Sequence, residues 1–277
     1  MPNWRSSWIL LGIAFLGTIV AHVAAEQPSD SDQAAREIIF KALERATENE
    51  EHNFAARYRS LMSRHIKRFD GQGSISEEDE GDYEVAPIDG VPFARRLTVG
   101  DRPLSAEEQR WEEEREAEFR KELKRIREND VATDEEDEEI RFNHELVERY
   151  AFTFDREELY RRRPTYRVSF RPRRDDLPVR RRIDYALNKA RGTVWIDVET
   201  YEAARVEFEL IDKVKLWWGM LGTINYARGS LDRRPVLDGT WAQVQLETYT
   251  DSRVVFKRTR RSEFLQWQSF EWVENEQ

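Results

Sequence analysis

Residues 192–211 read GTVWIDVETYEAARVEFELI, and this stretch contains two strand patterns with a turn between them. In the second pattern Val206, Phe208 and Leu210 alternate with charged residues, which is the period of two expected of a half-buried strand. Residues 197–200 (DVET), three of them polar, separate this pattern from the apolar run before it. A strand, a turn and a strand predict an antiparallel hairpin.

The same period recurs on both sides of this hairpin. Before it, Tyr166, Val168 and Phe170 alternate with polar residues, and after it Asp238–Gly239 and Asp251–Ser252 are turn signals. Four stretches between and beside these turns have strand character: 214–221, 241–249, 253–259 and 264–273. Short strands at this spacing predict an antiparallel meander.

A helix and further strands precede this meander. Beyond residue 54 the pattern is extended, and Tyr58, Met62 and Ile66 share one face of the expected strand. Turn residues then separate two more strands, 83–88 and 93–99. The helix is predicted from six apolar residues at the spacing of an amphipathic helix, namely Ala35, Ile38, Ile39, Ala42, Leu43 and Ala46.

Residues 104–148 differ from the rest of the chain and are predicted to be an acidic helical insertion. Ser105 and Glu108 form a capping box, which marks a helix start. The acidic run 134–139 is expected to be a solvated loop rather than a calcium site, because it lacks the ligand spacing and glycine of a calcium loop. The helix has a narrow apolar stripe made by Trp111, Phe119, Leu123 and Ile126.

The N-terminus has the features of a secretory signal peptide. Residues 8–25 are uncharged, and Val23 and Ala25 are the small residues that precede a cleavage site. We therefore predict a signal peptide at 1–25, a linker at 26–33 and a single domain at 34–277, exported to the periplasm or cell envelope. The alternative is an uncleaved N-terminal anchor, because 18 uncharged residues approach the length of a membrane span.

Composition excludes several kinds of chemistry. The chain has no Cys, so disulfides, thiolate metal sites and Cys nucleophiles are ruled out. The histidines lack the spacing of zinc motifs, and no nucleotide-binding or nucleophile-elbow motif occurs. We expect no cofactor, no metal, no catalytic residue and no enzyme activity. Glu207 and Glu209, two apart on one strand face, leave a glycosidase-like carboxylate pair as a minor alternative to a wet strand face.

Arginine is concentrated in one part of the chain. Export and the net charge of -10 argue against nucleic acid as its partner. Two interpretations stay open: ion pairs with the acidic helix, or attraction to anionic lipid head groups. The arginines concerned are Arg161, Arg162, Arg163, Arg171, Arg173, Arg174, Arg180, Arg181 and Arg182.

A continuous apolar run, LWWGML at 216–221, breaks the alternation around it. Large side chains must then point to both faces of the element that carries them, so one face is core and the other meets a helix, a partner or an apolar ligand. Trp195, Trp241 and Trp267 add aromatic rings to the same part of the sheet. A plain hydrophobic core and a ligand cavity are both compatible with this pattern.

The order of these elements and several short phrases resemble the periplasmic lipoprotein-carrier superfamily (LolA/LolB-like), including its relatives described as outer-membrane lipoprotein-sorting proteins. The resemblance covers most of the chain from 35 to 273. It implies an α+β fold, an incomplete antiparallel half-barrel with helices packed on its concave side, here with an added charged helix. The phrases are YEVAPIDGVPFARRL (83–97), RPLSAEEQ (102–109), GTVWID (192–197) and DGTW (238–241).

The resemblance also implies a function, namely non-enzymatic binding of a lipid or a lipoprotein acyl chain in the half-barrel cavity. The alternative is an envelope protein-interaction or sensing module with a filled core. No membrane span is expected after signal cleavage. The rim of the cavity would carry Arg167 and Arg171. The candidate apolar lining is Tyr58, Met62, Ile66, Trp195, Phe208, Leu216, Trp218 and Met220.

Overall fold

The computed structural model describes residues 30–129, 140–174, 176–216, 222–254 and 257–273. The predicted signal peptide at 1–25, the acidic run 134–139 and most of the LWWGML run lie outside these ranges. Among the helices within them, none combines the length and the apolar character needed to cross a bilayer. The helices are α1 (Asp30–His52), η1 (Phe54–Ala56), α2 (Ala106–Asn129), α3 (His144–Arg149) and α4 (Asp184–Leu187).

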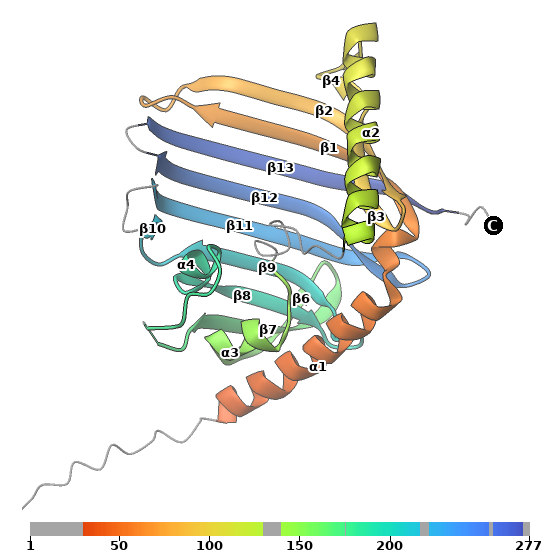
Figure 1. Cartoon of the computed structure of the whole chain (residues 1–277). Coiled ribbons are helices and arrows are strands. Elements are labelled where there is room, and N and C mark those ends of the chain that lie inside the picture. Colours follow the sequence, from red (N-terminus) through yellow and green to blue (C-terminus); the bar gives the residue numbers. More distant parts are fainter. Residues whose placement is uncertain (1–29, 130–139, 175, 217–221, 255–256, 274–277) are drawn as a thin grey trace, which may run out of the picture.

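Eleven strands form one antiparallel sheet, whose order is β3-β2-β1-β13-β12-β11-β9-β8-β7-β6, with β10 paired to β11 (Figure 1). The sheet begins at β3 and ends at β6, so it stays open, which confirms the predicted half-barrel. A small separate sheet joins β4 and β5. The strands are β1 (Tyr58–Phe69), β2 (Ile75–Ile88), β3 (Val91–Arg96), β4 (Thr98–Val99), β5 (Arg102–Pro103), β6 (Tyr150–Tyr160), β7 (Arg163–Pro172), β8 (Ala190–Asp197), β9 (Ala203–Leu210), β10 (Val214–Leu216), β11 (Gly222–Leu237), β12 (Thr240–Val254) and β13 (Lys257–Trp272).

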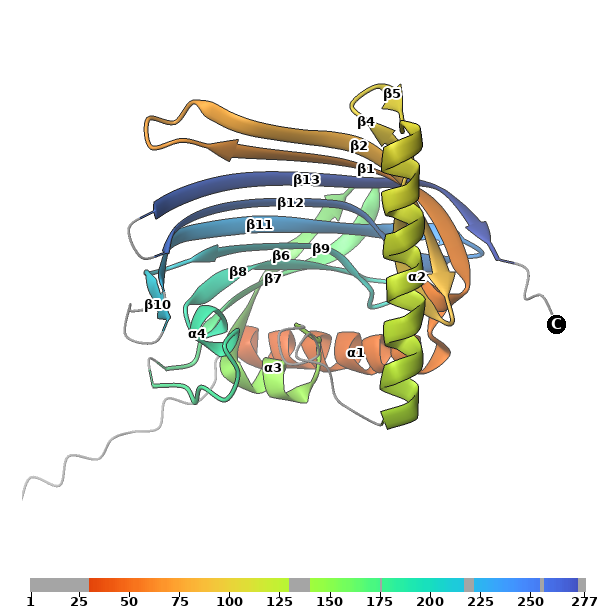
Figure 2. The ribbon, with the colours of Figure 1, turned by 45° about the horizontal axis from the view of Figure 1, so that its top comes forward.

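Helix α1 covers part of one face of this sheet, and the sheet curves around it (Figure 2). The predicted apolar stripe of the helix is buried there, and Ala35 and Ile39 are almost fully enclosed. Their partners on the sheet come from β6, β7 and β8, and include Phe152, Val168 and Val194. The concave face therefore has its main core under α1, at the β6 end of the sheet.

Cross-strand register defines what each face carries. Residues directly opposite each other on paired strands point to the same side of a sheet. On the concave face, one row of such pairs is entirely aliphatic over six neighbouring strands, and we call it the aliphatic row: Val168, Val194, Val206, Leu231, Leu246 and Leu265. The neighbouring residues on each strand point to the convex face.

Helix α2 lies beside the edge strand β3 (Figure 1). The ring centroids of Phe93 and Phe119 are 5.0 Å apart. Glu112 accepts a hydrogen bond from the backbone N–H of Arg96 at 3.1 Å, and the Arg115 guanidinium donates to the carbonyl oxygen of Ala94. Side chains of the helix thus satisfy backbone groups that a neighbouring strand would otherwise take. The predicted capping box is present, with Ser105 and Glu108 bonded reciprocally.

Some predicted boundaries differ from the structure. The expected turn at Asp251–Ser252 is wrong, because both residues lie inside β12 and pair with β13. Asp251 is buried there, and Arg258 donates to it from β13. The strand expected at 253–259 is accordingly divided between the end of β12 and the start of β13. Helix α1 begins at Asp30, within the stretch expected to be a linker.

The arginine-rich stretch pairs mostly with carboxylates close to it in the fold. Asp232 pairs with Arg161, and Asp197 pairs with Arg163 at 2.6 Å. On helix α2, the carboxylate of Glu116 pairs with Arg120 of the same helix and with Arg95 of β3. Among the ion pairs between described residues, none joins the arginine-rich stretch to α2, while Arg173 lies 3.6 Å from Glu148 of α3.

Asp184 is a fully buried carboxylate that fixes the segment before β8. Burial works to raise its pKa, but hydrogen bonds from the backbone amides of Arg181 and Arg180 and the charge of Arg149, 3.0 Å away, outweigh burial and hold the pKa below its usual range. A depressed folded-state pKa gives stability that is present above the unfolded value of about 3.9 and is lost as the pH falls through the folded value.

We therefore expect Asp184→Asn to lower the free energy of unfolding at pH 7 by roughly 1–3 kcal/mol, because buried donors lose a charged acceptor. It should also flatten the fall in stability below pH 4, measured by urea unfolding at several pH values. Asp176→Asn is the control, because Asp176 is exposed and its ion pair among the described residues is with exposed Arg174, at 3.2 Å. Equal acid sensitivity of the Asp184 variant and the wild type would contradict this account.

Candidate functional site

The aliphatic row is the main apolar feature of the concave face beyond the core under α1. Val168 and Val194, at the β6 end, are buried against α1. Val206, Leu231 and Leu246, together with Leu265, are only half-buried. Five inter-strand spacings of about 4.8 Å give the row a length of roughly 24 Å. Half-buried aliphatic side chains aligned across a curved sheet provide a surface for a long apolar ligand.

The row leads into a hollow of about 440 Å³ at the β3 end of the sheet. Leu265, Met62 and Tyr83 supply its apolar wall. Charged residues complete the lining: Arg64 and Glu263 beside Leu265 on the sheet, Arg96 on β3, and Glu112 and Arg115 on α2. The hollow therefore joins an apolar wall to a set of charges, as a site for an amphipathic molecule requires.

The charges of this hollow are held in pairs. Arg64 lies 3.5 Å from Glu263, and Arg96 lies 2.6 Å from Asp79. Burial works to raise the pKa of Glu112, but hydrogen bonds from Arg115 and from the backbone of Arg96 prevail and keep that pKa below its usual range. The carboxylate of Glu112 is therefore ionised at neutral pH.

A second hollow, of about 560 Å³, lies between the C-terminal half of α1 and strands β11 and β12. Phe54, Tyr58 and Trp241 line it with aromatic rings. Burial raises the pKa of Tyr58, so its hydroxyl stays neutral. Both hollows share strand β1, through Tyr58 and Met62, which lie roughly 14 Å apart along the strand at about 3.4 Å per residue.

Helix α1 is tied to the sheet by a buried carboxylate at the margin of this second hollow. Glu202 accepts hydrogen bonds from Asn49 at 2.6 Å and from Arg45 at 3.2 Å, both on α1. It also accepts from Arg233 of β11 at 2.7 Å. The side chain of Glu202, which directly precedes β9, thus links α1 to β11 and sets the distance between the helix and the concave face.

The residues predicted to line the apolar cavity lie on both faces of the sheet, and two of them lie outside the described residues. Met62 and Ile66 are buried on the concave face. Phe208 also points to that face, and its ring covers Gly229 of the neighbouring strand. Tyr58 lines the hollow beside α1. Of the remaining candidates, Leu216 ends β10 and its side chain is not described, while Trp218 and Met220 lie outside the described residues.

Trp195 is not on the concave face. It pairs in register with Arg167 and Arg205, and its neighbour Val194 belongs to the aliphatic row. Its indole N–H donates to Glu158 at 2.6 Å, and the Arg167 guanidinium lies 5.5 Å from the ring centroid. Arg167, expected at the cavity rim, therefore lies on the convex face.

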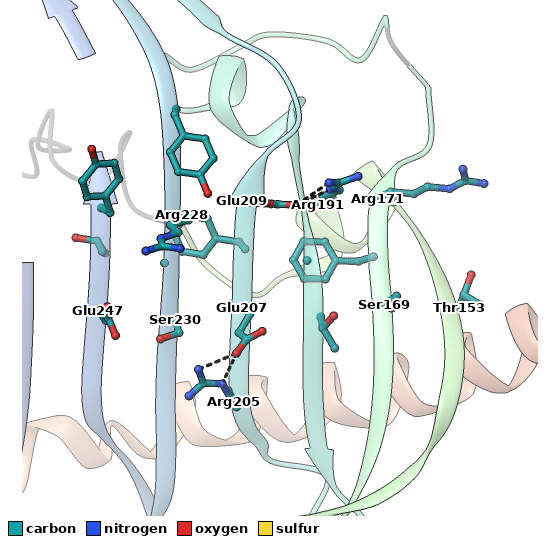
Figure 3. Close-up of a pocket in the computed structure, with 18 of the residues that line it drawn as sticks. Thr153, Ser169, Arg171, Arg191, Arg205, Glu207, Glu209, Arg228, Ser230 and Glu247 are labelled. Atoms are coloured by element: carbon teal, nitrogen blue, oxygen red, sulfur yellow. Dashed lines mark hydrogen bonds and ion pairs between the residues drawn. The ribbon is translucent and has the colours of Figure 1, made fainter. Parts of the chain in front are cut away.

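Arg171, the other predicted rim residue, is also on the convex face. It lines a groove there, together with Glu207 and Glu209 (Figure 3). Glu207 pairs with Arg205 and Glu209 with Arg191, each at 2.7 Å. These ion pairs occupy both carboxylates, which favours the wet strand face over a pair of catalytic acids. Among the residues that the structure describes, no three His, Asp or Glu side chains gather as a metal site.

Sequence reasoning missed the central members of the aliphatic row. Leu246 and Leu265 lie in stretches predicted to be strands, while Leu231 lies in β11, which the sequence did not predict, and the alignment of all three depends on strand register. Register is fixed by the pairing of strands that are far apart in sequence, as between β9 and β11. Local patterns could therefore indicate Leu246 and Leu265 as strand residues, but they could not indicate the row.

These elements define an open antiparallel half-barrel of the α+β class with a helix on its concave side. No family model matches the chain, and no curated protein matches it.

Three solved structures are similar to the chain over most of its length. One is an outer membrane lipoprotein-sorting protein domain from Vibrio parahaemolyticus (12% identity, 86% of this chain, 95% of that chain, TM-score 0.38). Another is a LolA superfamily protein from Nitrosomonas europaea (9% identity, 87% and 94%, TM-score 0.31). The third is the Pseudomonas aeruginosa MucA/MucB complex (10% identity, 83% and 99%, TM-score 0.23).

Proposed function

We propose that this protein is an exported envelope protein that binds a lipid acyl chain non-enzymatically along the aliphatic row of its concave face. The observation that supports this most directly is the row itself, four of whose members are half-buried. Its length of roughly 24 Å exceeds the roughly 15 Å that one leaflet of bilayer hydrocarbon occupies. Burial of an acyl chain there gains roughly 25 cal/mol per Å² of apolar surface removed from water.

The hollow at the β3 end is suited to the polar end of the same lipid. Leu265 belongs to both the row and the hollow, so an acyl chain on the row reaches Arg64 and Arg96 at its end. Arginine pairs readily with carboxylate and phosphate groups. A free fatty acid, a phospholipid and the lipid of a lipoprotein all combine an apolar chain with a polar end, and the proposal covers this class.

The test is native mass spectrometry of the exported chain before and after incubation with palmitate. We expect a stoichiometric adduct. Leu246→Glu, at the centre of the row, should weaken palmitate binding at least about tenfold, because it places a carboxylate where the chain packs. Leu159→Glu is the matched control, since Leu159 is 73% exposed on β6.

A thermal melt establishes that each variant is folded. If Leu246→Glu is unfolded, Leu246→Phe narrows the row without adding a charge and should also weaken binding. Equal binding by the Leu246 and Leu159 variants would overturn the proposed site. A wild-type chain that is empty and also resists loading would favour the alternative, a protein-interaction module.

One observation favours that alternative specifically. Trp111 on α2 is 59% exposed, although its neighbour Glu112 bonds to the backbone of β3. An exposed tryptophan on a helix is a common anchor for a protein partner. Trp111→Ala would leave palmitate binding intact under the lipid proposal, whereas it would remove partner binding under the alternative.

A further inference from the structure

The convex face carries a groove of about 700 Å³ that the lipid proposal does not use (Figure 3). Its floor is a second cross-strand row, which we call the polar row. The members pair in register across six strands and are short hydroxyl or carboxylate side chains: Thr153, Ser169, Thr193, Glu207, Ser230 and Glu247. Five spacings of about 4.8 Å make the row roughly 24 Å long.

A parallel row of longer side chains forms one wall of the groove. Arg191, Glu209, Arg228 and Tyr249 are opposite one another in register on β8, β9, β11 and β12. The residues between the two rows are partly glycine, Gly192 and Gly229, and both line the groove. Short floor residues beside a long-chained wall are the physical cause of the hollow.

The charges of the groove divide into paired and unpaired groups. Arg191 with Glu209 and Arg205 with Glu207 are ion pairs. Arg171, Arg228 and Glu247 are exposed in the groove, and no ion pair joins any of them to another described residue. The two ion pairs are each neutral, so the remaining charges in the groove are the guanidinium groups of Arg171 and Arg228 and the carboxylate of Glu247. This excess of positive charge favours an anionic ligand.

The groove also offers many hydrogen-bonding groups and two aromatic rings. Each ion pair presents donors and acceptors side by side, and the hydroxyls of Thr193 and Ser230 add both types. The hydroxyls of Thr153 and Ser169 already donate to Asp32 and Asp155 and add acceptors. The rings of Tyr226 and Tyr249 flank one end, with centroids 6.2 Å apart. Adjacent hydroxyl groups of a sugar ring match such side-by-side donors and acceptors, and the C–H face of a sugar packs on an aromatic ring.

From this geometry we propose that the convex groove binds an acidic oligosaccharide, with Arg228 as the main contact for its carboxylate or phosphate group. An acyl chain does not fit a floor of hydroxyls and carboxylates, because it cannot replace the water that they bind. An extended peptide usually pairs with an edge strand. The strands under the centre of this groove are internal, and their backbone groups are already paired.

The experiment is isothermal titration of the exported chain with tetragalacturonate, which has sugar hydroxyls and carboxylates. Maltotetraose supplies the hydroxyls without charge, and tetraglutamate supplies the charge without sugar. We expect tetragalacturonate to bind at least about tenfold more tightly than either, because both features are recognised. Arg228→Gln should weaken its binding about tenfold or more, since a hydrogen bond to a charged group is lost.

Arg234→Gln is the matched control, because Arg234 is exposed on the same strand and lies outside the groove. The affinity of the Arg234→Gln variant for tetragalacturonate should stay within about twofold of the wild-type affinity. Ser230→Phe fills the floor and should abolish binding. Absence of tetragalacturonate binding, equal binding of tetraglutamate, or equal effects of the Arg228 and Arg234 variants would each overturn the proposal.

A glycolipid head group has the same chemistry as a free oligosaccharide. Phosphatidylcholine vesicles that contain glucuronosyl diacylglycerol are therefore a second probe. The wild-type chain could bind these vesicles but not tetragalacturonate, with vesicle binding lost in Arg228→Gln. That result would assign the groove to a glycolipid head group and overturn the proposal that it binds a free oligosaccharide. Palmitate binding is expected to be unchanged in Arg228→Gln, because the groove and the aliphatic row lie on opposite faces.

Discussion

Replacing Glu202 by glutamine is expected to lower the free energy of unfolding by about 3 kcal/mol. The Glu202 side chain is 2% exposed and accepts hydrogen bonds from Arg45, Asn49 and Arg233. Glutamine keeps the shape but removes the charge, so Arg233 loses the carboxylate it pairs with and Arg45 retains only its pair with exposed Glu48. This decrease in the free energy of unfolding is at the low end of what breaking a buried ion pair costs, because Arg45 and Arg233 both retain some contact with water.

The measurement is urea unfolding of wild type, Glu202→Gln and Glu199→Gln. Glu199 lies three residues earlier, its side chain is 83% exposed, and its pair with Arg163 is expected to contribute little. Hydrogen exchange should also show faster opening of α1 in the Glu202 variant, because two of the three donors are on that helix. Equal stability of the Glu202 and Glu199 variants would show that the carboxylate does not hold α1.

Replacing Gly192 by alanine is expected to cost about 3 kcal/mol. A Cβ built at Gly192 overlaps the carbonyl oxygen of Glu207 on the paired strand and lies 2.6 Å from Cζ of Phe170. The ring can move, but the carbonyl is part of the sheet, so β8 and β9 must separate. Gly192 also lines the convex groove, so the change should distort that groove.

Gly71→Ala is the control for this prediction. Gly71 lies in the turn between β1 and β2, and a Cβ there meets no heavy atom within 4 Å. Thermal unfolding should show a large decrease in Tm for the Gly192 variant and almost none for the Gly71 variant. A small effect at Gly192 would mean that the strands relax more easily than their packing indicates.

The sequence predicted those parts of the fold that depend on local periodicity. The apolar positions of α1 repeat every three or four residues, and the helix buries that stripe. Val206, Phe208 and Leu210 alternate with charged residues, and β9 carries them on one face as expected. The capping box at Ser105 and Glu108 marks the start of α2 closely.

Features that depend on pairing between distant strands could not be predicted. Val194, Trp195 and Ile196 are all apolar, so periodicity could not decide which of them faces α1. The structure resolves this through the partners of Trp195, two arginines and a glutamate on the convex face. Asp251 has the local character of a turn residue, but ion pairing with Arg258 allows it to lie within a strand.

The contact between α2 and β3 has a consequence for how copies of this chain behave at high concentration. An open sheet has two free edges, and an exposed edge is a template on which another chain can add a strand. Glu112 and Arg115 occupy the outward backbone groups of Arg96 and Ala94. The inserted helix therefore protects one edge of the half-barrel from edge-to-edge aggregation, a protection that closed barrels obtain from their own first and last strands.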